Sequence, residues 1–417
     1  MKNTIKIPKI LLPKVGVDKS KWSVIACDQF TSQPNYWEQL DKFVGNAPST
    51  LRLIFPEVYL EGADKQERIK SINANMKKYL QEGIFEEFEG FEGFVLVERI
   101  TPDGQKRLGL VIAVDLEDYE YTPQNDALIK ATEKTVVERL PARIEVRKGA
   151  CLESPHIMML MDDRKDRIIE NLYARKEQFQ LAYDFALNMG GGSIKGYKIK
   201  DCNGIIESIN RLLDKDVLAE KYGSGKPILF AVGDGNHSLA TAKECWNNIK
   251  KTLSRDDLDN HPARYALCEL VNLHDESLEF QPIHRAVFGV GEEFVEFMKS
   301  SLAKSDGESA VKVVFGSKTY YWNVSSNASD AIADIQQLMD EYNESHKDMV
   351  IDYIHGDEHL LNVAKEKNAV AVFMPCLEKD GLFDYVVRRG VLPRKSFSMG
   401  HAEDKRYYLE CRKIGEY

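Results

Sequence analysis

The stretch Ile228-Leu229-Phe230-Ala231-Val232-Gly233-Asp234-Gly235-Asn236-His237-Ser238-Leu239-Ala240-Thr241-Ala242 passes from an apolar run through a glycine-rich turn into an alanine-rich segment. The apolar run predicts a short buried strand, and residues 236–249 predict a helix. Asp234 or Asn236 can cap this helix, while Gly233 and Gly235 let the backbone approach a ligand closely. We therefore expect a strand-turn-helix unit whose turn faces a ligand.

The first turn of this helix carries groups suited to an anion. Unpaired backbone N–H groups and the positive end of the helix dipole favour a ligand such as phosphate. His237 lies in that turn, where it could donate a hydrogen bond or transfer a proton near neutral pH. The same residues also fit a capped turn with a structural histidine, because the spacing does not match the phosphate-binding P-loop pattern.

Strand-like and helix-like stretches alternate along the whole chain. Residues 94–99 and 107–114 are apolar and flank a Thr-Pro-Asp-Gly turn, which predicts a β-hairpin. Residues 163–188 carry apolar residues at helical spacing and predict a helix that the glycines at 190–192 end. This mixture predicts an α/β (α+β) fold with mixed sheets and flanking helices. A break at residue 223 suggests two intimately packed subdomains, residues 1–222 and residues 223–417, the second carrying the Gly-Asp-Gly-Asn-His turn.

Composition narrows the class of protein. The chain has 417 residues, and 56 Lys+Arg against 66 Asp+Glu leave a formal net charge of −10. It therefore lacks a global basic footprint for nucleic acid or anionic lipid. The apolar runs fall far short of the roughly 20 residues of a spanning helix, and the first residues do not form a secretory leader. Seven dispersed cysteines favour a reduced thiol state, so we expect a cytoplasmic protein without nucleic-acid or membrane partners.

A second polar segment runs from Glu133 to Arg147. After Pro141, strict alternation predicts a strand with Arg143, Glu145 and Arg147 on one face. Such a row is either a solvated edge-strand face or a clamp for phosphate or carboxylate. Glu133 is the candidate general base of this segment, the alternative being an ordinary surface glutamate.

Two further segments bring cationic side chains. His284 and Arg285 precede an apolar stretch, and in a strand they would point to opposite faces, so only one of them would reach a shared site. Near the end of the chain, Leu392-Pro393-Arg394-Lys395-Ser396 combines a turn with two cations and a hydroxyl. That chemistry suits phosphate.

Taken together, these segments resemble a known family. The turn at residues 234–238 looks like the Asp-Gly-His-His-Arg stretch of the bacterial and archaeal proteins grouped under domain of unknown function 1015. Residues 133–139, 282–285 and 392–396 look familial as well. Ala26-Cys27-Asp28-Gln29-Phe30 stands where that family has a Pro-Tyr-Asp-Val-like start. This chain departs from the pattern at Asn236 and Ser238, where the family has His and Arg.

The same turn is similar to one in the ParB/sulfiredoxin-like superfamily, where it holds nucleotide phosphates. The resemblance implies phosphate or nucleotide binding through Asp234, Asn236 and His237, and a ParB/sulfiredoxin-like element in the fold. Because Ser238 replaces a cation, either another segment supplies the positive charge or the ligand differs. DNA binding, known among partition proteins, is not implied, since the acidic balance opposes it.

The prediction from the sequence is a phosphate- or nucleotide-binding protein that acts as a small-molecule, kinase-like phosphotransferase. The alternatives are a non-catalytic nucleotide or metabolite sensor and a hydrolase of a small phosphorylated metabolite. A nucleotide with Mg²⁺ is the expected cofactor, with Asp234 as the metal ligand. The catalytic candidates are His237, Glu133 and Asp28. The candidates for binding the cofactor are Gly233, Asp234, Gly235, Asn236, Ser238, Arg139, Arg143, His284, Arg285 and Lys395.

Overall fold

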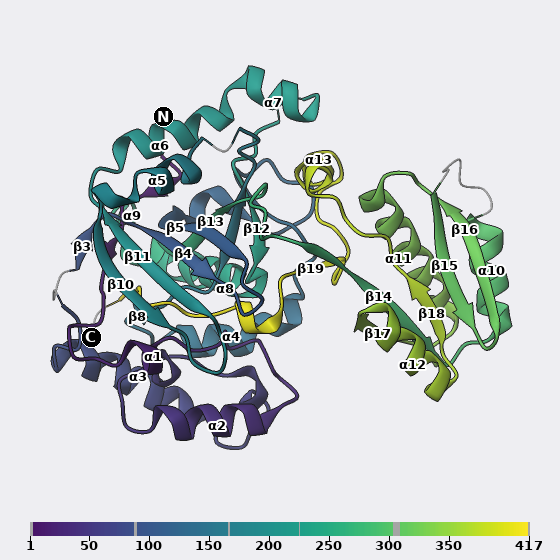
Figure 1. The fold of residues 1–417 in the computed structure, drawn as a ribbon, viewed down its shortest axis with the longest axis horizontal. Coiled ribbons are helices and arrows are strands. Elements are labelled where there is room, and N and C mark those ends of the chain that lie inside the picture. Colours follow the sequence, from purple (N-terminus) through teal and green to yellow (C-terminus); the bar gives the residue numbers. More distant parts are fainter. Residues whose placement is uncertain (1–2, 87–89, 166, 225, 303–308, 416–417) are drawn as a thin grey trace. The chain divides into compact units, whose positions relative to one another are not determined.

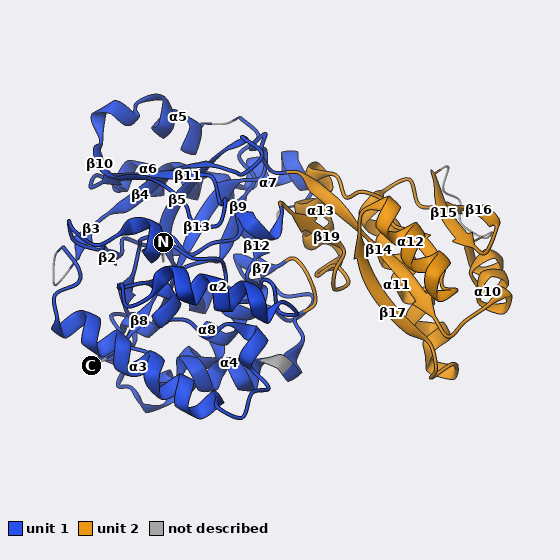
Figure 2. Ribbon diagram, turned by 60° about the horizontal axis from the view of Figure 1, so that its bottom comes forward, with its two compact units in different colours: residues 1–131, 135–278, 401–417 blue, residues 132–134, 279–400 orange. Residues whose placement is uncertain are grey.

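The computed structural model describes residues 3–86, 90–165, 167–224, 226–302 and 309–415 (Figure 1). The chain forms two compact units (Figure 2). Unit 1 comprises residues 1–131, 135–278 and 401–417, and unit 2 comprises residues 132–134 and 279–400. The units do not follow the expected boundary at residue 223, because strands on both sides of it pair in one sheet.

Unit 1 is built on a large mixed sheet with the strand order β10-β11-β4-β5-β13-β9-β12-β7-β6, and β1 also pairs with β5. The mixed α/β class predicted from the sequence is confirmed. Two small sheets, β2 with β3 and β8 with β20, complete the unit. The strands are β1 (Ile5–Lys6), β2 (Lys9–Ile10), β3 (Phe91–Glu92), β4 (Phe94–Ile100), β5 (Lys106–Asp115), β6 (Tyr119–Glu120), β7 (Ile129–Ala131), β8 (Leu152–Glu153), β9 (Met158–Met161), β10 (Gln180–Ala186), β11 (Ser193–Ile199), β12 (Phe230–Asp234), β13 (Tyr265–Asn272) and β20 (Arg412–Lys413).

The predicted hairpin is confirmed as the antiparallel pair β4 and β5. Alternate residues of β4 enter different cores, since Phe94 and Leu96 belong to one cluster and Val95 and Val97 to another. Both faces of the central strands are therefore covered, which explains why β4 and β5 are apolar along nearly their whole length.

Helices cover both faces of this sheet. Apolar residues of α5, α6 and α8 belong to the core that contains Phe94, and those of α3 belong to the core that contains Val95. The helices of unit 1 are α1 (Lys19–Trp22), α2 (Pro34–Val44), α3 (Lys65–Gln81), α4 (Leu140–Arg147), α5 (Ile169–Ala174), α6 (Asn203–Asn210), α7 (Lys215–Tyr222), α8 (Asn236–Ile249) and α9 (Arg255–Leu258). The helix predicted at residues 236–249 is confirmed as α8.

Two local predictions are wrong. Residues 163–188 do not form one helix, because the short α5 is followed by the strand β10, and the glycines at 190–192 join β10 to β11. Residues 140–147 form α4 rather than a strand. Pro141 lies in the first turn of α4, where its fixed φ and missing N–H are tolerated. Arg143 and Arg147 consequently share a helix face through their i,i+4 spacing, and Glu145 lies apart from them.

Unit 2 has a sheet with the strand order β16-β15-β18-β14-β17, and β19 pairs with β14. Residues 132–134 join this unit through a bridge between Glu133 and Leu392. The elements are β14 (Phe280–Phe288), β15 (Ser309–Phe315), β16 (Lys318–Val324), β17 (Val350–His355), β18 (Val370–Phe373), β19 (Phe397–Met399), α10 (Glu292–Leu302), α11 (Ala328–Ser345), α12 (Asp357–Lys367) and α13 (Lys379–Arg389). Across the described parts of both units, no helix has the length and apolar character needed to cross a membrane.

A buried polar cluster lies against the central strands of unit 1. Arg99 and Arg107 are register partners on β4 and β5 and are buried, an arrangement in which two like charges repel. Arg107 Nη2 donates to the Tyr408 hydroxyl at 2.8 Å and lies 3.5 Å from Glu269 Oε2. Residues from the end of the chain therefore partner charges on the central sheet.

Glu410 belongs to the same end segment and makes the stability of the protein depend on pH. Burial raises the pKa of its carboxyl to about 7, although the Tyr183 hydroxyl donates to it at 2.7 Å. In the unfolded chain the pKa is about 4.3. Between these values the folded protein holds a proton that the unfolded chain has lost, so stability falls as the pH rises through this window.

We predict that Glu410→Gln removes this component of the pH dependence. As the pH rises from about 4 to about 7, the wild type should lose about 1–3 kcal/mol of its free energy of unfolding relative to the variant. Urea unfolding at several pH values measures the difference. Glu403→Gln is the control, because Glu403 is an exposed glutamate in the same segment. A Glu410→Gln variant that loses stability with pH as the wild type does would contradict the assignment.

Candidate functional site

The candidate site lies in unit 1, where β12 ends and α8 begins. Gly235 occupies the N-cap of α8 with a φ of +82°, a conformation that glycine adopts without the strain of a side chain. A Cβ at this position would lie 3.1 Å from Ile157 Cα. The N-cap is therefore neither Asp234 nor Asn236, the two residues predicted from the sequence. Because glycine has no side chain, the first-turn N–H groups receive no hydrogen bond from a cap side chain.

The residues that follow Gly235 hold α8 in place and leave a polar atom unsatisfied. Leu239, Ala242 and Trp246 pack in the core of unit 1, which fixes the direction of the helix. Asn236 Oδ1 is buried and has no hydrogen-bond partner among the described residues. The start of α8 thus combines a rigid position with unsatisfied polar groups.

Lys405 brings a positive charge to this turn. Its Nζ lies 3.4 Å from Asp234 Oδ2, and both side chains are largely buried, with 18% and 23% of their surface exposed. The Lys405 carbonyl accepts a hydrogen bond from the Ala26 N–H at 2.8 Å. This contact holds the segment that carries Asp28 beside the segment that carries Lys405.

Asp28 is ionised at neutral pH in this setting. Burial opposes its ionisation, but His156 and Lys405 lie close enough to overcome that effect, so the pKa of Asp28 is lowered. Gln29 Nε2 also donates to Asp28 Oδ1 at 3.0 Å. The ionised carboxylate can therefore stabilise a positively charged neighbour.

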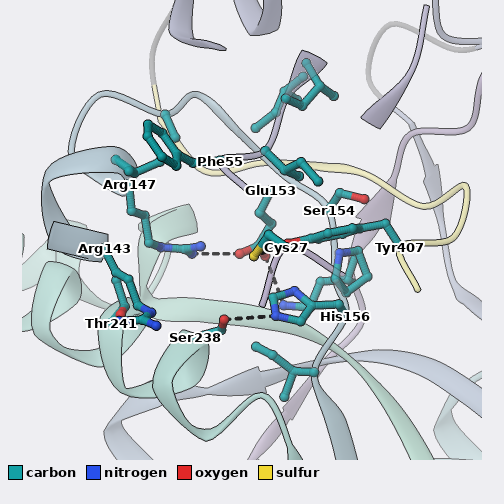
Figure 3. Close-up of a pocket in the computed structure, with 18 of the residues that line it drawn as sticks. Cys27, Phe55, Arg143, Arg147, Glu153, Ser154, His156, Ser238, Thr241 and Tyr407 are labelled. Carbon is teal, nitrogen blue, oxygen red and sulfur yellow. Dashed lines mark hydrogen bonds and ion pairs between the residues drawn. The ribbon is translucent and has the colours of Figure 1, made fainter. Parts of the chain in front are cut away.

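His156 connects Asp28 with the first turn of α8. Its Nε2 lies 3.0 Å from Ser238 Oγ, as Figure 3 shows with a dashed line. The ring also packs against Tyr407, with the ring centroids 4.7 Å apart. His156 precedes the buried strand β9, so a rigid element positions its imidazole.

His237 is engaged with the backbone. Its Nε2 accepts a hydrogen bond from the Val136 N–H at 3.3 Å. Its carbonyl accepts from Thr241 Oγ1 at 2.7 Å. Through its side chain, His237 ties the segment after β7 to the start of α8.

A cavity of about 150 Å³ adjoins the site. His156, Ser238 and Thr241 line it together with Tyr407, whose hydroxyl donates to Cys27 Sγ at 3.1 Å (Figure 3). Burial raises the pKa of the Cys27 thiol, so the sulfur stays protonated. Much of the remaining wall is apolar, with side chains from Leu53, Ile54, Phe55, Leu60, Met76, Val146, Leu152, Ile157 and Leu267.

The two α4 arginines also line this cavity, each in an ion pair. Arg143 pairs with Glu57, its Nε lying 2.9 Å from Glu57 Oε1. Arg147 Nη2 lies 2.7 Å from Glu153 Oε2. Because each guanidinium already has a carboxylate partner, the cavity wall is close to neutral.

The other sequence candidates belong mostly to unit 2. The Glu133 carboxylate accepts from the backbone N–H groups of Ser396 at 2.9 Å and Lys395 at 3.2 Å, and burial raises its pKa. His284 and Arg285 are both buried on β14. The side chain of Arg139 lies outside the part that the structure describes.

His284 and Arg285 have protein partners in unit 2. His284 Nδ1 accepts from the Met374 N–H at 3.0 Å, so its Nε2 donates to Asp357 Oδ1 at 2.8 Å. Arg285 Nε donates to Gln336 Oε1 at 3.0 Å. The structure therefore brings Asp28, Asp234, His237 and Ser238 into one region of unit 1, and places Glu133, His284, Arg285 and Lys395 in the other unit.

Two residues of the site were missed from the sequence. His156 follows Ser154 and Pro155 in a short loop, and Lys405 stands in a charged run near the end of the chain. Neither has a motif around it. The turn signal before a buried strand could have marked His156, whereas only tertiary contacts reveal Lys405.

Among the residues that the structure describes, no three His, Cys, Asp or Glu side chains gather in a way that could hold a metal ion. Asp234 is the carboxylate nearest the start of α8 in sequence. An ion such as Mg²⁺ is commonly bound by one or two carboxylates plus the phosphates of its ligand. Asp234, the metal ligand predicted from the sequence, is ion-paired with Lys405.

Comparisons with known proteins add the following likenesses. No curated protein matches the sequence significantly. A conserved hypothetical protein from Pyrococcus furiosus is 12% identical, with a TM-score of 0.35, over 70% of this chain and 90% of that chain. Free serine kinase in complex with AMP is 13% identical, with a TM-score of 0.38, over 73% and 91%. SbnI with a C-terminal truncation, from Staphylococcus aureus, is 9% identical, with a TM-score of 0.36, over 70% and 82%.

One family model covers most of the chain, residues 11–389. The match includes Asp28, His156 and the turn at residues 233–238, and it ends before Lys405. It confirms the resemblance seen in the sequence. The chain belongs to the family described as Protein of unknown function (DUF1015).

Proposed function

We propose that this protein binds the phosphate group of a nucleotide or small metabolite at the start of α8 and acts as a small-molecule phosphotransferase. The observation that carries the proposal is the convergence of Lys405, Asp28 and the His156–Ser238 pair on a helix start whose N-cap is glycine. Phosphoryl transfer depends mainly on positioning and charge stabilisation, and this convergence offers both.

The phosphate oxygens would be held by two kinds of donor. The N–H groups of residues 236–238 begin a helix of 14 residues, and a helix start favours negative charge. Lys405 is ion-paired with Asp234 at the same turn, and its ammonium group would donate to the phosphate from within that pair. This lysine would supply the positive charge that Ser238 lacks.

Proton transfer would fall to His156 with Asp28 beside it. His156 hydrogen-bonds a hydroxyl and has an ionised carboxylate nearby, the arrangement expected of a general acid or base. His237 would orient the start of α8 through its bond to Val136. With a Mg²⁺-nucleotide, Asp234 would hold the ion, whose charge neutralises the phosphates.

The adjoining cavity suits the rest of the ligand. Its wall is largely apolar and its two arginines are paired with carboxylates. A largely apolar pocket with a few polar groups is typical of small-molecule sites. The uncharged part of a nucleotide or metabolite would lie there, next to a phosphate at α8.

The state of the cysteines supports a cytoplasmic location. All seven cysteines are free thiols, the state expected in a reducing compartment. We keep the expectation of small-molecule partners rather than nucleic acid, because the net charge is −10 and nucleic-acid interfaces are strongly basic.

Incubation with ATP, ADP or CTP and Mg²⁺ tests the proposal. A phosphotransferase or hydrolase consumes nucleotide, and its melting temperature rises because a ligand at 100 times its dissociation constant stabilises a protein by about 2.7 kcal/mol. A rise without turnover would favour the alternative of a nucleotide sensor. Neither turnover nor a rise, with these nucleotides and with phosphorylated metabolites, would contradict the phosphate site.

We predict that Lys405→Met weakens binding of the phosphorylated ligand by about 10- to 100-fold, because a charge-assisted hydrogen bond contributes about 1.5–3 kcal/mol. Isothermal titration calorimetry with the ligand found in the screen measures the loss. Lys42→Met is the matched control, since Lys42 is an exposed lysine of α2 in unit 1. Equal effects of the two variants would show that Lys405 is not the cation that binds the phosphate.

A further inference from the structure

Ser238 has a hydroxyl placed like an activated nucleophile. It is the third residue of α8, and its Oγ lies 3.0 Å from His156 Nε2. A neutral imidazole that carries its proton on Nδ1 accepts the hydroxyl proton at Nε2. A serine paired with a base at this distance is the usual signature of nucleophilic catalysis.

Asp28 supplies the third group of such an arrangement. The neighbouring His156 is one cause of the lowered pKa of the Asp28 carboxyl. Its carboxylate would stabilise the imidazolium that forms when His156 takes the serine proton. The contact between the His156 and Tyr407 rings limits rotation of the imidazole.

The surroundings leave room for a reacting group. Ser238 and His156 both line the cavity of about 150 Å³. The sequence resemblance led us to expect a cation at position 238, and this chain has a hydroxyl there and a cation at Lys405 instead. The turn has therefore lost a charge that binds phosphate and gained a group that can attack it.

We propose that Ser238 is a catalytic nucleophile that carries a phosphoryl group between a phosphate ester or anhydride donor and an alcohol or water acceptor. The inference rests on the phosphate site proposed above and adds a covalent step to it. Direct transfer from donor to acceptor would not need a serine hydroxyl paired with a histidine.

The two steps balance as follows. Ser238 Oγ attacks the donor phosphorus, the Oγ–P bond forms, and the bond between phosphorus and the leaving oxygen breaks. The serine proton passes to His156 Nε2 and from there to the leaving oxygen. In the second step the acceptor oxygen attacks phosphorus, its proton passes to His156, and the Oγ–P bond breaks as Ser238 Oγ regains a proton.

The experiment uses the full chain with ATP and Mg²⁺ in the absence of an added acceptor. Rapid quenching and intact-protein mass spectrometry detect a phosphoryl group on the protein, and peptide mapping locates it. We expect the group on Ser238 in the wild type and none in Ser238→Ala. Exchange of labelled ADP into ATP, which requires a phosphorylated enzyme, should show the same pattern.

Two variants support the assignment. His156→Asn should slow phosphorylation of Ser238 by about 10²- to 10⁴-fold, the usual contribution of a general base. Ser300→Ala is the control, since Ser300 is an exposed serine of α10 in unit 2. It should behave as the wild type does in both assays.

The outcomes separate the two proposals. If Ser238→Ala keeps the ATP-dependent rise in melting temperature but loses exchange and phosphorylation, the nucleophile is supported. If Ser238→Ala retains turnover within about threefold, the nucleophile is overturned and the phosphate site stands. If the wild type shows neither a rise in melting temperature nor turnover, the phosphate site fails and the nucleophile fails with it.

Discussion

The candidate site depends on the turn at which β12 ends and α8 begins. Gly235 has a positive φ there, which disfavours any side chain, and a Cβ would lie only 3.1 Å from Ile157 Cα. The turn joins the buried strand β12 to α8, whose apolar side chains pack in the core of unit 1. Because its N-cap is glycine, the first turn of α8 has no capping side chain. The proposed phosphate site and the proposed nucleophile both follow from the fixed direction of that helix.

The end of the chain completes unit 1 on two sides. Lys405 and Tyr407 point to the candidate site, and Tyr408 and Glu410, from the same segment, contact the buried arginine and tyrosine beside the central sheet. A segment far along the sequence thus supplies a cation to the site and partners to charges in the core. Residues 401–411 therefore contribute both to the candidate site and to the core of unit 1.

The sequence predicted those strands, turns and helices that are set by the local pattern of apolar residues and glycines. The strand, turn and helix at residues 228–249 and the β4–β5 hairpin followed from apolar periodicity and glycine position. The strand predicted after Pro141 is the helix α4 in the structure. A short alternation of charged and apolar residues also fits a helix that has a proline in its first turn. His156 and Lys405 carry no local signal, since tertiary contacts between distant segments bring them to α8. Whether Glu133 or Lys395 contributes to the site stays a prediction.

The central claim is that the first-turn N–H groups of α8 bind phosphate oxygens. The most direct test is the amide resonances of Asn236, His237 and Ser238 in a ¹⁵N-labelled protein during titration with ATP and Mg²⁺. The account predicts that these three resonances move together and saturate. Saturable shifts elsewhere, with these three unmoved, would contradict it.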